Sequence, residues 1–208
     1  MTGHPLDHLV YGVPDLAEGV RQFADLTGVA PVRGGHHERQ GTANYLLGVG
    51  GAAYLEIIGP DPESAGPPAW FGLAELRAPR LLTWAIRPSD PAACIAAARA
   101  AGYDPGEAMA MSRRSSSGEL LSWRLTPDTV RQTGGVVPFL IDWGDSPHPS
   151  DLGLPQLELL SFTVLTATSD RTRSRLAALG ATAVDVEPAG ETGLCCVLGT
   201  ATGPVTLS

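Results

Sequence analysis

The sequence predicts an α+β fold built from three repeats of the unit strand-helix-strand-strand-strand. Strand-like runs that begin at residues 6, 81 and 157 are each followed by an Asp and a stretch of helical periodicity, which ends at Gly28, Gly102 or Gly180. Short β-type runs separated by turn residues follow each of these glycines. With 208 residues, the chain can form one continuous body or two fused halves.

The first unit covers residues 1–60. Its helix is predicted to begin at Asp15, which forms a capping box with Glu18, and to end at Gly28. Strands are expected at residues 6–13, 30–33, 42–49 and 52–58. The proline-rich stretch 61–80 follows as a linker or lid, in which Trp70 and Phe71 are expected to pack on the body.

The second unit covers residues 81–144, and a third, partial unit covers residues 156–208. In the second unit, Asp90 and Pro91 start a helix. Its strands are expected at 81–87, 108–112, 119–125 and 136–143, with a turn at 115–118. In the third unit we expect a helix at 169–179 and strands at 157–165, 182–186, 194–199 and 204–207. His148, in the linker between the two units, is expected to be exposed.

Composition excludes several classes of protein. The formal net charge of -8, without clustered cations, argues against a nucleic-acid surface. No apolar run approaches the roughly 18 to 20 residues of a membrane helix, so we expect a cytoplasmic protein without a membrane partner. The three cysteines, Cys94, Cys195 and Cys196, support neither a disulfide framework nor a zinc knuckle.

His8 and Glu56 stand out because each lies in the middle of an apolar strand. Alternation along a strand places His8 on the face of Leu6 and Val10, and Glu56 on the face of Tyr54 and Ile58. Burying such groups is costly unless they meet a partner. Three interpretations follow: a satisfied internal pair, two ligands of a divalent metal, or an acid/base couple without a metal.

The sequence resembles the glyoxalase-like branch of the vicinal-oxygen-chelate superfamily. In the first unit the resemblance rests on five segments, which are Leu6-Asp7-His8-Leu9-Val10-Tyr11, Val13-Pro14-Asp15-Leu16, Gly34-Gly35-His36-His37, Gly41-Thr42-Ala43-Asn44 and Tyr54-Leu55-Glu56-Ile57-Ile58. In the second unit, the later signature of the family resembles Arg113 or Arg114, Gly118, Trp123 and the run Pro138-Phe139-Leu140-Ile141-Asp142-Trp143.

The resemblance implies paired βαβββ modules whose curled mixed sheets form a partly closed barrel around a cavity. It also implies that His8 and Glu56 are ligands of a divalent metal, which could be Zn, Ni, Mn or Fe. The second module departs from the family because Thr83 stands where a third ligand is expected. Asp142 in its last strand is one residue out of register with Glu56 when the strands are aligned on Gly144 and Gly59.

Further candidates surround this pair. His37 is a candidate catalytic group or substitute ligand, provided that the glycine-rich loop 34–41 folds over the cavity. At most one of the neighbours Arg113 and Arg114 can enter the pocket, where it would hold a carboxylate or phosphate. The remaining candidates for substrate binding are Asn44, Trp123, Asp142 and Trp143, although Asn44 could instead pin its strand and the aromatic residues could belong to the core.

Two functions remain in competition. The first is a metal-assisted small-molecule enzyme, either an isomerase, a lyase or a ring-cleaving dioxygenase, in which Glu56 also moves a proton. The second is a metal-free protein of the same fold that binds or sequesters a small molecule. The missing ligand in the second unit favours binding, and the intact pair favours catalysis. The odd third unit could cover the barrel or recruit a second chain in a homodimer.

Overall fold

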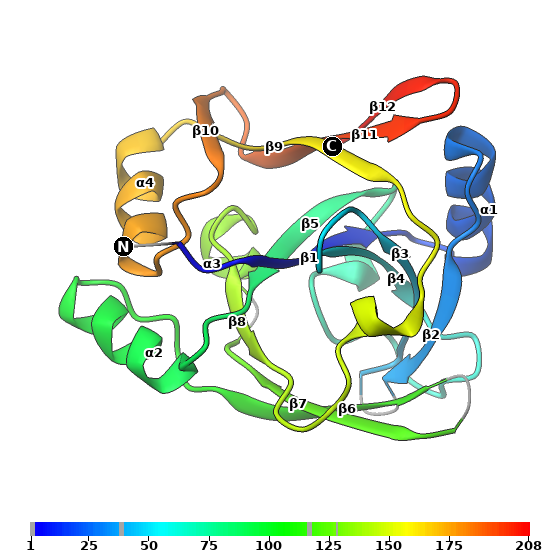
Figure 1. Cartoon of the computed structure of the whole chain (residues 1–208), viewed down its shortest axis with the longest axis horizontal. Helices are drawn as coiled ribbons and strands as arrows, with labels where there is room; N and C mark the ends of the chain where they lie inside the picture. Colours follow the sequence, from blue (N-terminus) through cyan, green and yellow to red (C-terminus); the bar gives the residue numbers. More distant parts are fainter. Residues whose placement is uncertain (1–2, 38–39, 116–117, 128) are drawn as a thin grey trace.

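The structure is a computed structural model that describes residues 3–37, 40–115, 118–127 and 129–208. Within these residues, eight strands of mixed direction form a closed barrel (Figure 1). Around the barrel they are β1 (Leu6–Gly12), β4 (Tyr54–Pro60), β3 (Thr42–Gly48), β2 (Val32–His37), β6 (Met109–Ser115), β7 (Leu120–Leu125), β8 (Phe139–Asp142) and β5 (Arg80–Ile86). The predicted fold class is confirmed. The barrel is fully closed, whereas a partly closed barrel was expected.

Helices pack on the outside of the barrel, and local signals fix their ends. Asp15 accepts a hydrogen bond from the backbone N–H of Glu18 at the start of α1 (Leu16–Thr27), and Gly28 ends this helix with a left-handed φ of 73°. Asp90 caps α2 (Pro91–Ala100) in the same way. The other helical segments are η1 (Leu73–Glu75), α3 (Val130–Thr133), η2 (Pro149–Leu152) and α4 (Ser169–Ala178). No helix among the described residues is long and apolar enough to span a membrane.

The third unit forms a separate sheet beside the barrel. Its order is β10 (Asp185–Pro188), β9 (Glu158–Thr166), β11 (Gly193–Thr200) and β12 (Gly203–Leu207). The element order repeats that of the first unit, but the strand order does not. In the first unit, the first strand pairs in parallel with the last, whereas β9 pairs in parallel with β10 and antiparallel with β11. Figure 1 shows this sheet along one side of the barrel, between α4 and α1.

The register of β1 and β5 relates the two halves of the barrel. These strands are antiparallel, and His8 lies opposite Ala85 while Val10 lies opposite Thr83. This pattern makes Thr83 the counterpart of His8, and Ala85 the counterpart of Val10. In the parallel pairs, Val10 is aligned with Glu56, and Ala85 with Phe139. The counterpart of Glu56 is therefore Phe139, three residues before Asp142.

Side chains form two apolar clusters, one on each side of the barrel wall. The inner cluster includes Val10, Leu46, Ile58 and Phe139. The outer cluster joins the barrel to its helices and to the second sheet, and its members include Leu9, Phe23, Trp84, Ile95, Val164, Leu176, Leu194 and Leu198. Because strands alternate their faces, β1 can supply Leu9 to one cluster and Val10 to the other. The inner cluster leaves room for the site described below.

Two local predictions need correction. Residues 34–37, expected in a loop, belong to strand β2, which pairs with β3 and β6. Residues 38–39 of that predicted loop lie outside the described residues, as do residues 116–117 of the predicted turn 115–118. The short helix α3 was not predicted, and the strand expected at 136–143 is confined to Phe139–Asp142.

Candidate functional site

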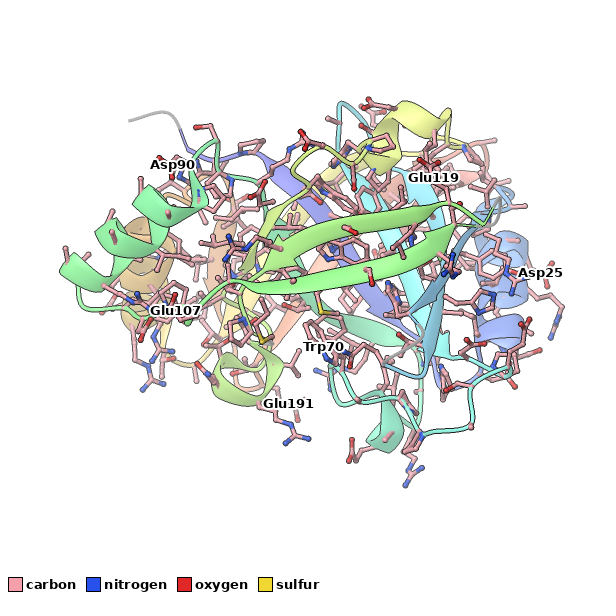
Figure 2. All side chains as sticks on the ribbon, turned by 90° about the horizontal axis from the view of Figure 1, so that it is seen from below. Asp25, Trp70, Asp90, Glu107, Glu119 and Glu191 are labelled. Carbon is pink, nitrogen blue, oxygen red and sulfur yellow. The ribbon has the colours of Figure 1, made fainter. Side chains whose placement is uncertain are left out.

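The barrel encloses a narrow cavity of about 40 Å3, as traced by the centre of a water-sized sphere; the empty space is about 510 Å3 when the open solvent at its mouth is included. Strands from both halves line it, and the segment between β4 and β5 adds Trp70 and Phe71 to the wall, so this segment packs on the body as expected. Figure 2 shows Trp70 beside the hairpin of β6 and β7. The polar side chains on the wall are His8, His37, Gln40, Thr42, Asn44, Tyr54, Glu56 and Arg113.

His8 is held in the wall by contacts on several sides. Its Nδ1 lies 2.6 Å from Oδ1 of Asp7. The imidazole stacks on the ring of Tyr54, with centroids 4.7 Å apart, and meets the edge of Phe139. Its Nε2 lies 3.7 Å from Oε2 of Glu56. Both predicted residues therefore face one cavity, and a single orientation of the imidazole is fixed.

Asp7 is the buried residue that orients His8. The pairing of β1 with β5 shifts register between Leu6 and His8, and such a bulge can redirect a side chain. Burial alone would raise the pKa of Asp7, but hydrogen bonds from His148 and His8 hold it well below its usual range. Because an ionised carboxylate only accepts hydrogen bonds, Nδ1 of His8 carries the proton. The Nε2 atom is the one left to act in the cavity.

The linker after β8 reaches the same carboxylate. His148 Nε2 lies 3.0 Å from Oδ2 of Asp7, and the indole N–H of Trp143 donates to this oxygen at 3.2 Å. The prediction that His148 is exposed was wrong, since only 7% of its surface is accessible. A buried carboxylate needs several donors, and this requirement draws the linker inwards.

Glu56, Asn44 and Arg113 form a chain of hydrogen bonds across the cavity wall. The side-chain amide of Asn44 donates to Oε1 of Glu56 at 2.5 Å and accepts from Nη1 of Arg113 at 2.9 Å. Asn44 is thereby fixed at both ends, and Oε2 of Glu56 remains directed at His8. Arg113 is 3% exposed, and its Nε and Nη2 atoms have no hydrogen-bond acceptor within the described part of the chain.

His37 is a second imidazole in the wall. Its Nδ1 lies 3.0 Å from the hydroxyl of Thr42, and its ring meets the edge of Trp123. Burial lowers the pKa of His37 to about 4. The ring is therefore neutral at pH 7 and can donate or accept a hydrogen bond without carrying charge. Its neighbour His36 points the other way and lies 2.8 Å from Asp61.

The remaining candidates divide between the cavity and the surface. Trp123 and Trp143 line the cavity. Arg114 is exposed and donates to the carbonyl of Gly118. Asp142 lies outside the cavity and accepts a hydrogen bond from the backbone N–H of Gly144 at 3.0 Å. The structure thus brings seven of the nine predicted site residues together and leaves Arg114 and Asp142 outside.

The donors present do not fit a divalent metal centre. His8 and Glu56 could supply two ligands, but their counterparts in the second half are Thr83 and Phe139. The Thr83 hydroxyl forms a hydrogen bond with the Thr129 hydroxyl at 3.2 Å, and the side chain of Phe139 has no atom that can ligate a metal. In the described ranges, no group of three or more His, Cys, Asp or Glu side chains is placed to hold a metal. Zinc centres use at least three protein ligands, so the expected third ligand is missing.

Sequence reasoning missed three parts of this site. Asp7 was part of the recognised run, but strict alternation placed it on the opposite face from His8. Tyr54 was treated as a neighbour of Glu56, although it stacks on His8. Phe71 has a left-handed φ of 57°, which is strained for a residue with a side chain, and it stacks on Phe139. The adjacency of Asp7 and His8 was the available signal for the first of these.

Comparisons with known proteins agree with this architecture. The family model of a glyoxalase-like domain matches residues 6–180. A search of curated proteins finds no match. A solved structure of a hypothetical protein from Staphylococcus aureus is 15% identical, with a TM-score of 0.66, over 90% of this chain and 87% of its own. A variant of methylmalonyl-CoA epimerase from Streptomyces coelicolor is 22% identical, with a TM-score of 0.48, over 71% of this chain and 99% of its own.

Proposed function

The chain belongs to the glyoxalase-like family, and from this premise we propose that its cavity is the active site of an enzyme that moves a proton within a small carbonyl compound. The observation that carries the proposal is the pair of His8 Nε2 and Glu56 Oε2, 3.7 Å apart on one wall. Both atoms can accept a proton, and both are held by buried partners. Such fixed groups are the requirement for general acid–base catalysis.

In the proposed reaction, Glu56 removes a proton from the carbon next to the carbonyl group. The C–H electron pair moves into the C–C bond, and the carbonyl oxygen gains the negative charge of an enolate. His8 Nε2 lies 3.7 Å from Oε2 of Glu56, beyond direct hydrogen-bond reach, so the two groups exchange this proton through the substrate or one bridging water. Because the two groups lie together on one wall, the proton is delivered on the face from which it left but to a neighbouring carbon of the substrate, which gives the isomer. This geometry supports an isomerase, or a lyase in which the enolate expels a leaving group.

Asp7 and Asn44 act as positioning residues in this scheme. Asp7 keeps the proton of His8 on Nδ1, and Asn44 leaves only Oε2 of Glu56 free to face the substrate. The aromatic wall makes the surroundings of the pair less polar than water, which strengthens the electrostatic interactions within the cavity. His37, neutral at pH 7, is proposed as a hydrogen-bond partner for the substrate.

Solvent exchange tests this function directly. Small aldehydes, ketones, 2-oxo acids and their esters would be incubated with the protein in D2O, and loss of the α-proton followed by 1H NMR. We expect enzyme-dependent exchange in at least one class, with loss of exchange in Glu56→Gln. His8→Gln should slow exchange by roughly 100-fold or more. Exchange that survives Glu56→Gln unchanged would refute the assignment.

The alternative is a protein that binds a small molecule without transforming it. The extent of aromatic lining favours this function, since Trp70, Phe71, Trp123, Phe139 and Trp143 all face the cavity. The same experiment separates the two. Compounds that raise the melting temperature but never exchange their α-protons would establish the binding function.

A further inference from the structure

We infer that Arg113 is the recognition site for a carboxylate group, so that the ligand of the cavity is a small monocarboxylic acid with an apolar or aromatic body. The inference rests on the proposed function only in placing the ligand in the same cavity. It adds the class of compound that the cavity selects. Arg113 lines the cavity, and only 3% of its surface is exposed to solvent.

The unused atoms of Arg113 form the edge that binds carboxylates. Nη1 is occupied by Asn44, at 2.9 Å. Nε and Nη2, which lie on one side of the planar guanidinium, are buried and have no acceptor in the described protein. Their two N–H bonds are parallel and match the two oxygens of a carboxylate. Burying a cation with two unsatisfied donors is costly, and an anionic ligand would relieve this cost.

Local structure keeps Arg113 available for a ligand. Asn44 stands between the guanidinium and Glu56, so the nearest carboxylate on the wall is bonded through the amide and not to Arg113 directly. Gly34 makes room for this arrangement, since a Cβ at this position would lie 2.5 Å from Nη1 of Arg113 and 2.3 Å from Oδ1 of Asn44. The sequence therefore maintains a fixed guanidinium beside the proposed base.

The charge and lining of the cavity favour a monocarboxylate over a phosphate. Arg113 is the one Lys or Arg side chain on the wall within the described ranges, and Glu56 lies nearby. A phosphate dianion would exceed this single cation and would be repelled by Glu56. The rest of the wall is mostly apolar and includes Ile58, Trp70 and Phe71. Such a wall suits the hydrocarbon body of the acid.

Binding measurements with matched probes test this inference. The probes are phenylacetate, 4-phenylbutyrate and phenylglyoxylate, each with its methyl ester and primary amide, together with inorganic phosphate. Affinity would be measured by calorimetry and by quenching of tryptophan fluorescence, because three tryptophans line the cavity. We expect the wild-type protein to bind at least one acid about 10- to 100-fold more tightly than its ester.

The variants are Arg113→Met, Arg113→Lys and, as a matched control, Arg114→Met. Arg113→Met should abolish the preference for the acid and leave the affinity for the ester unchanged, whereas Arg114→Met should keep the preference. Arg113→Lys keeps the positive charge but loses the two parallel N–H donors of the guanidinium, so an intermediate preference is expected. This variant serves as the test if circular dichroism shows that Arg113→Met is not folded. Equal affinity for acid and ester, no binding of any probe, tighter binding of phosphate, or a preference that survives in Arg113→Met would each overturn the inference.

Failure of this inference can be told apart from failure of the proposed function. Glu56→Gln should lose solvent exchange yet still prefer acids over esters, since it removes the base and leaves Arg113 in place. If acids bind through Arg113 but never exchange, the proposed reaction fails and the carboxylate site stands. If only neutral carbonyl compounds bind and exchange, the reaction stands and the carboxylate site fails.

Discussion

The two halves of the barrel share one architecture but differ in their chemistry. His8 and Glu56 in the first half correspond in register to Thr83 and Phe139 in the second. The first pair places two titratable side chains on the cavity. In the second pair, the hydroxyl of Thr83 is hydrogen-bonded to Thr129, and the ring of Phe139 packs on His8. The second half nevertheless contributes Arg113 and much of the aromatic wall.

This difference shows how a symmetric scaffold can separate two roles. The backbone pairing of both halves is preserved, because strand register depends on main-chain hydrogen bonds and on the burial of alternate residues. The side chains that face inwards are free to differ. In this chain, the first half supplies the residues of the proposed proton transfer. The second half supplies much of the aromatic wall of the cavity and Arg113, the proposed binding site for a carboxylate.

The strongest test of the difference between the two halves is to introduce metal-ligating side chains into the second half. The double substitution Thr83→His with Phe139→Glu should place four metal donors on the two pairs of strands. We expect the affinity for Zn²⁺ or Ni²⁺ to rise by about 1,000-fold or more over the wild type, since three or more ligands define a structural or catalytic centre. Calorimetry with metal-free protein measures this gain. Thr83→His combined with Glu56→Gln is the matched control and should bind weakly; a double variant that folds and gains no affinity would show that the register equivalence is wrong.

The next effect concerns the unequal roles of His8 and its counterpart. Once a compound that undergoes α-proton exchange is identified, His8→Gln should slow its exchange by roughly 100- to 10,000-fold, because it removes a positioned proton acceptor. Thr83→Ser keeps the hydroxyl and should change the rate by less than about threefold. The NMR exchange assay measures both. Equal losses in the two variants would contradict the assignment of the chemistry to the first half.

The buried imidazole of His37 makes stability depend on pH. Its pKa is lowered to about 4 in the folded state, against a usual value near 6.5 in an unfolded chain. The unfolded state therefore binds the extra proton, and the free energy of unfolding should fall as the pH decreases from about 6.5 to 4. The loss attributable to His37 is on the order of 2 to 3 kcal/mol. Urea denaturation at several pH values should show a shallower decrease for His37→Gln, and an identical decrease would count against this explanation.

The smallest effect is expected at Asp142, which lies in the last strand of the second half but outside the cavity. Asp142→Asn retains an oxygen that can accept from the N–H of Gly144. We expect the free energy of unfolding to change by less than about 0.5 kcal/mol, with no change in exchange rate. Thermal denaturation and the exchange assay check this expectation. A large loss of exchange would bring Asp142 back as a site residue.

Much of the fold could be predicted because its signals are local. Asp15 and Asp90 mark helix starts through side-chain caps, and Gly28 marks a helix end through its left-handed backbone. The closure of the barrel and the different strand order of the third unit depend on contacts between distant segments. Those contacts leave no local pattern, so the sequence predicted the elements better than their arrangement.

The same distinction holds for the site. Alternation along regular strands gave the faces of His8 and Glu56, and the family resemblance was needed to place both residues on one cavity. Alternation failed at Asp7, because the pairing shifts register there. For Asp142, the one-residue slip already indicated the opposite face, and Asp142 does lie outside the cavity. Alternation could not choose between Arg113 and Arg114 without knowing which face of β6 is inside. His148 was misjudged because the path of its linker depends on a buried carboxylate far away in the sequence.

The second sheet has a consequence for how the chain can be divided. Its residues Val164, Leu194 and Leu198 share one apolar cluster with Trp84 of the barrel, and the carbonyl of Ser208 accepts a hydrogen bond from the N–H of Leu81. The family match ends at residue 180, before β11 and β12 complete this sheet. A fragment cut at that boundary would expose the shared apolar surface to water, where it would favour aggregation. The smallest unit able to fold cooperatively is therefore larger than the matched region 6–180, and the last strands are part of it.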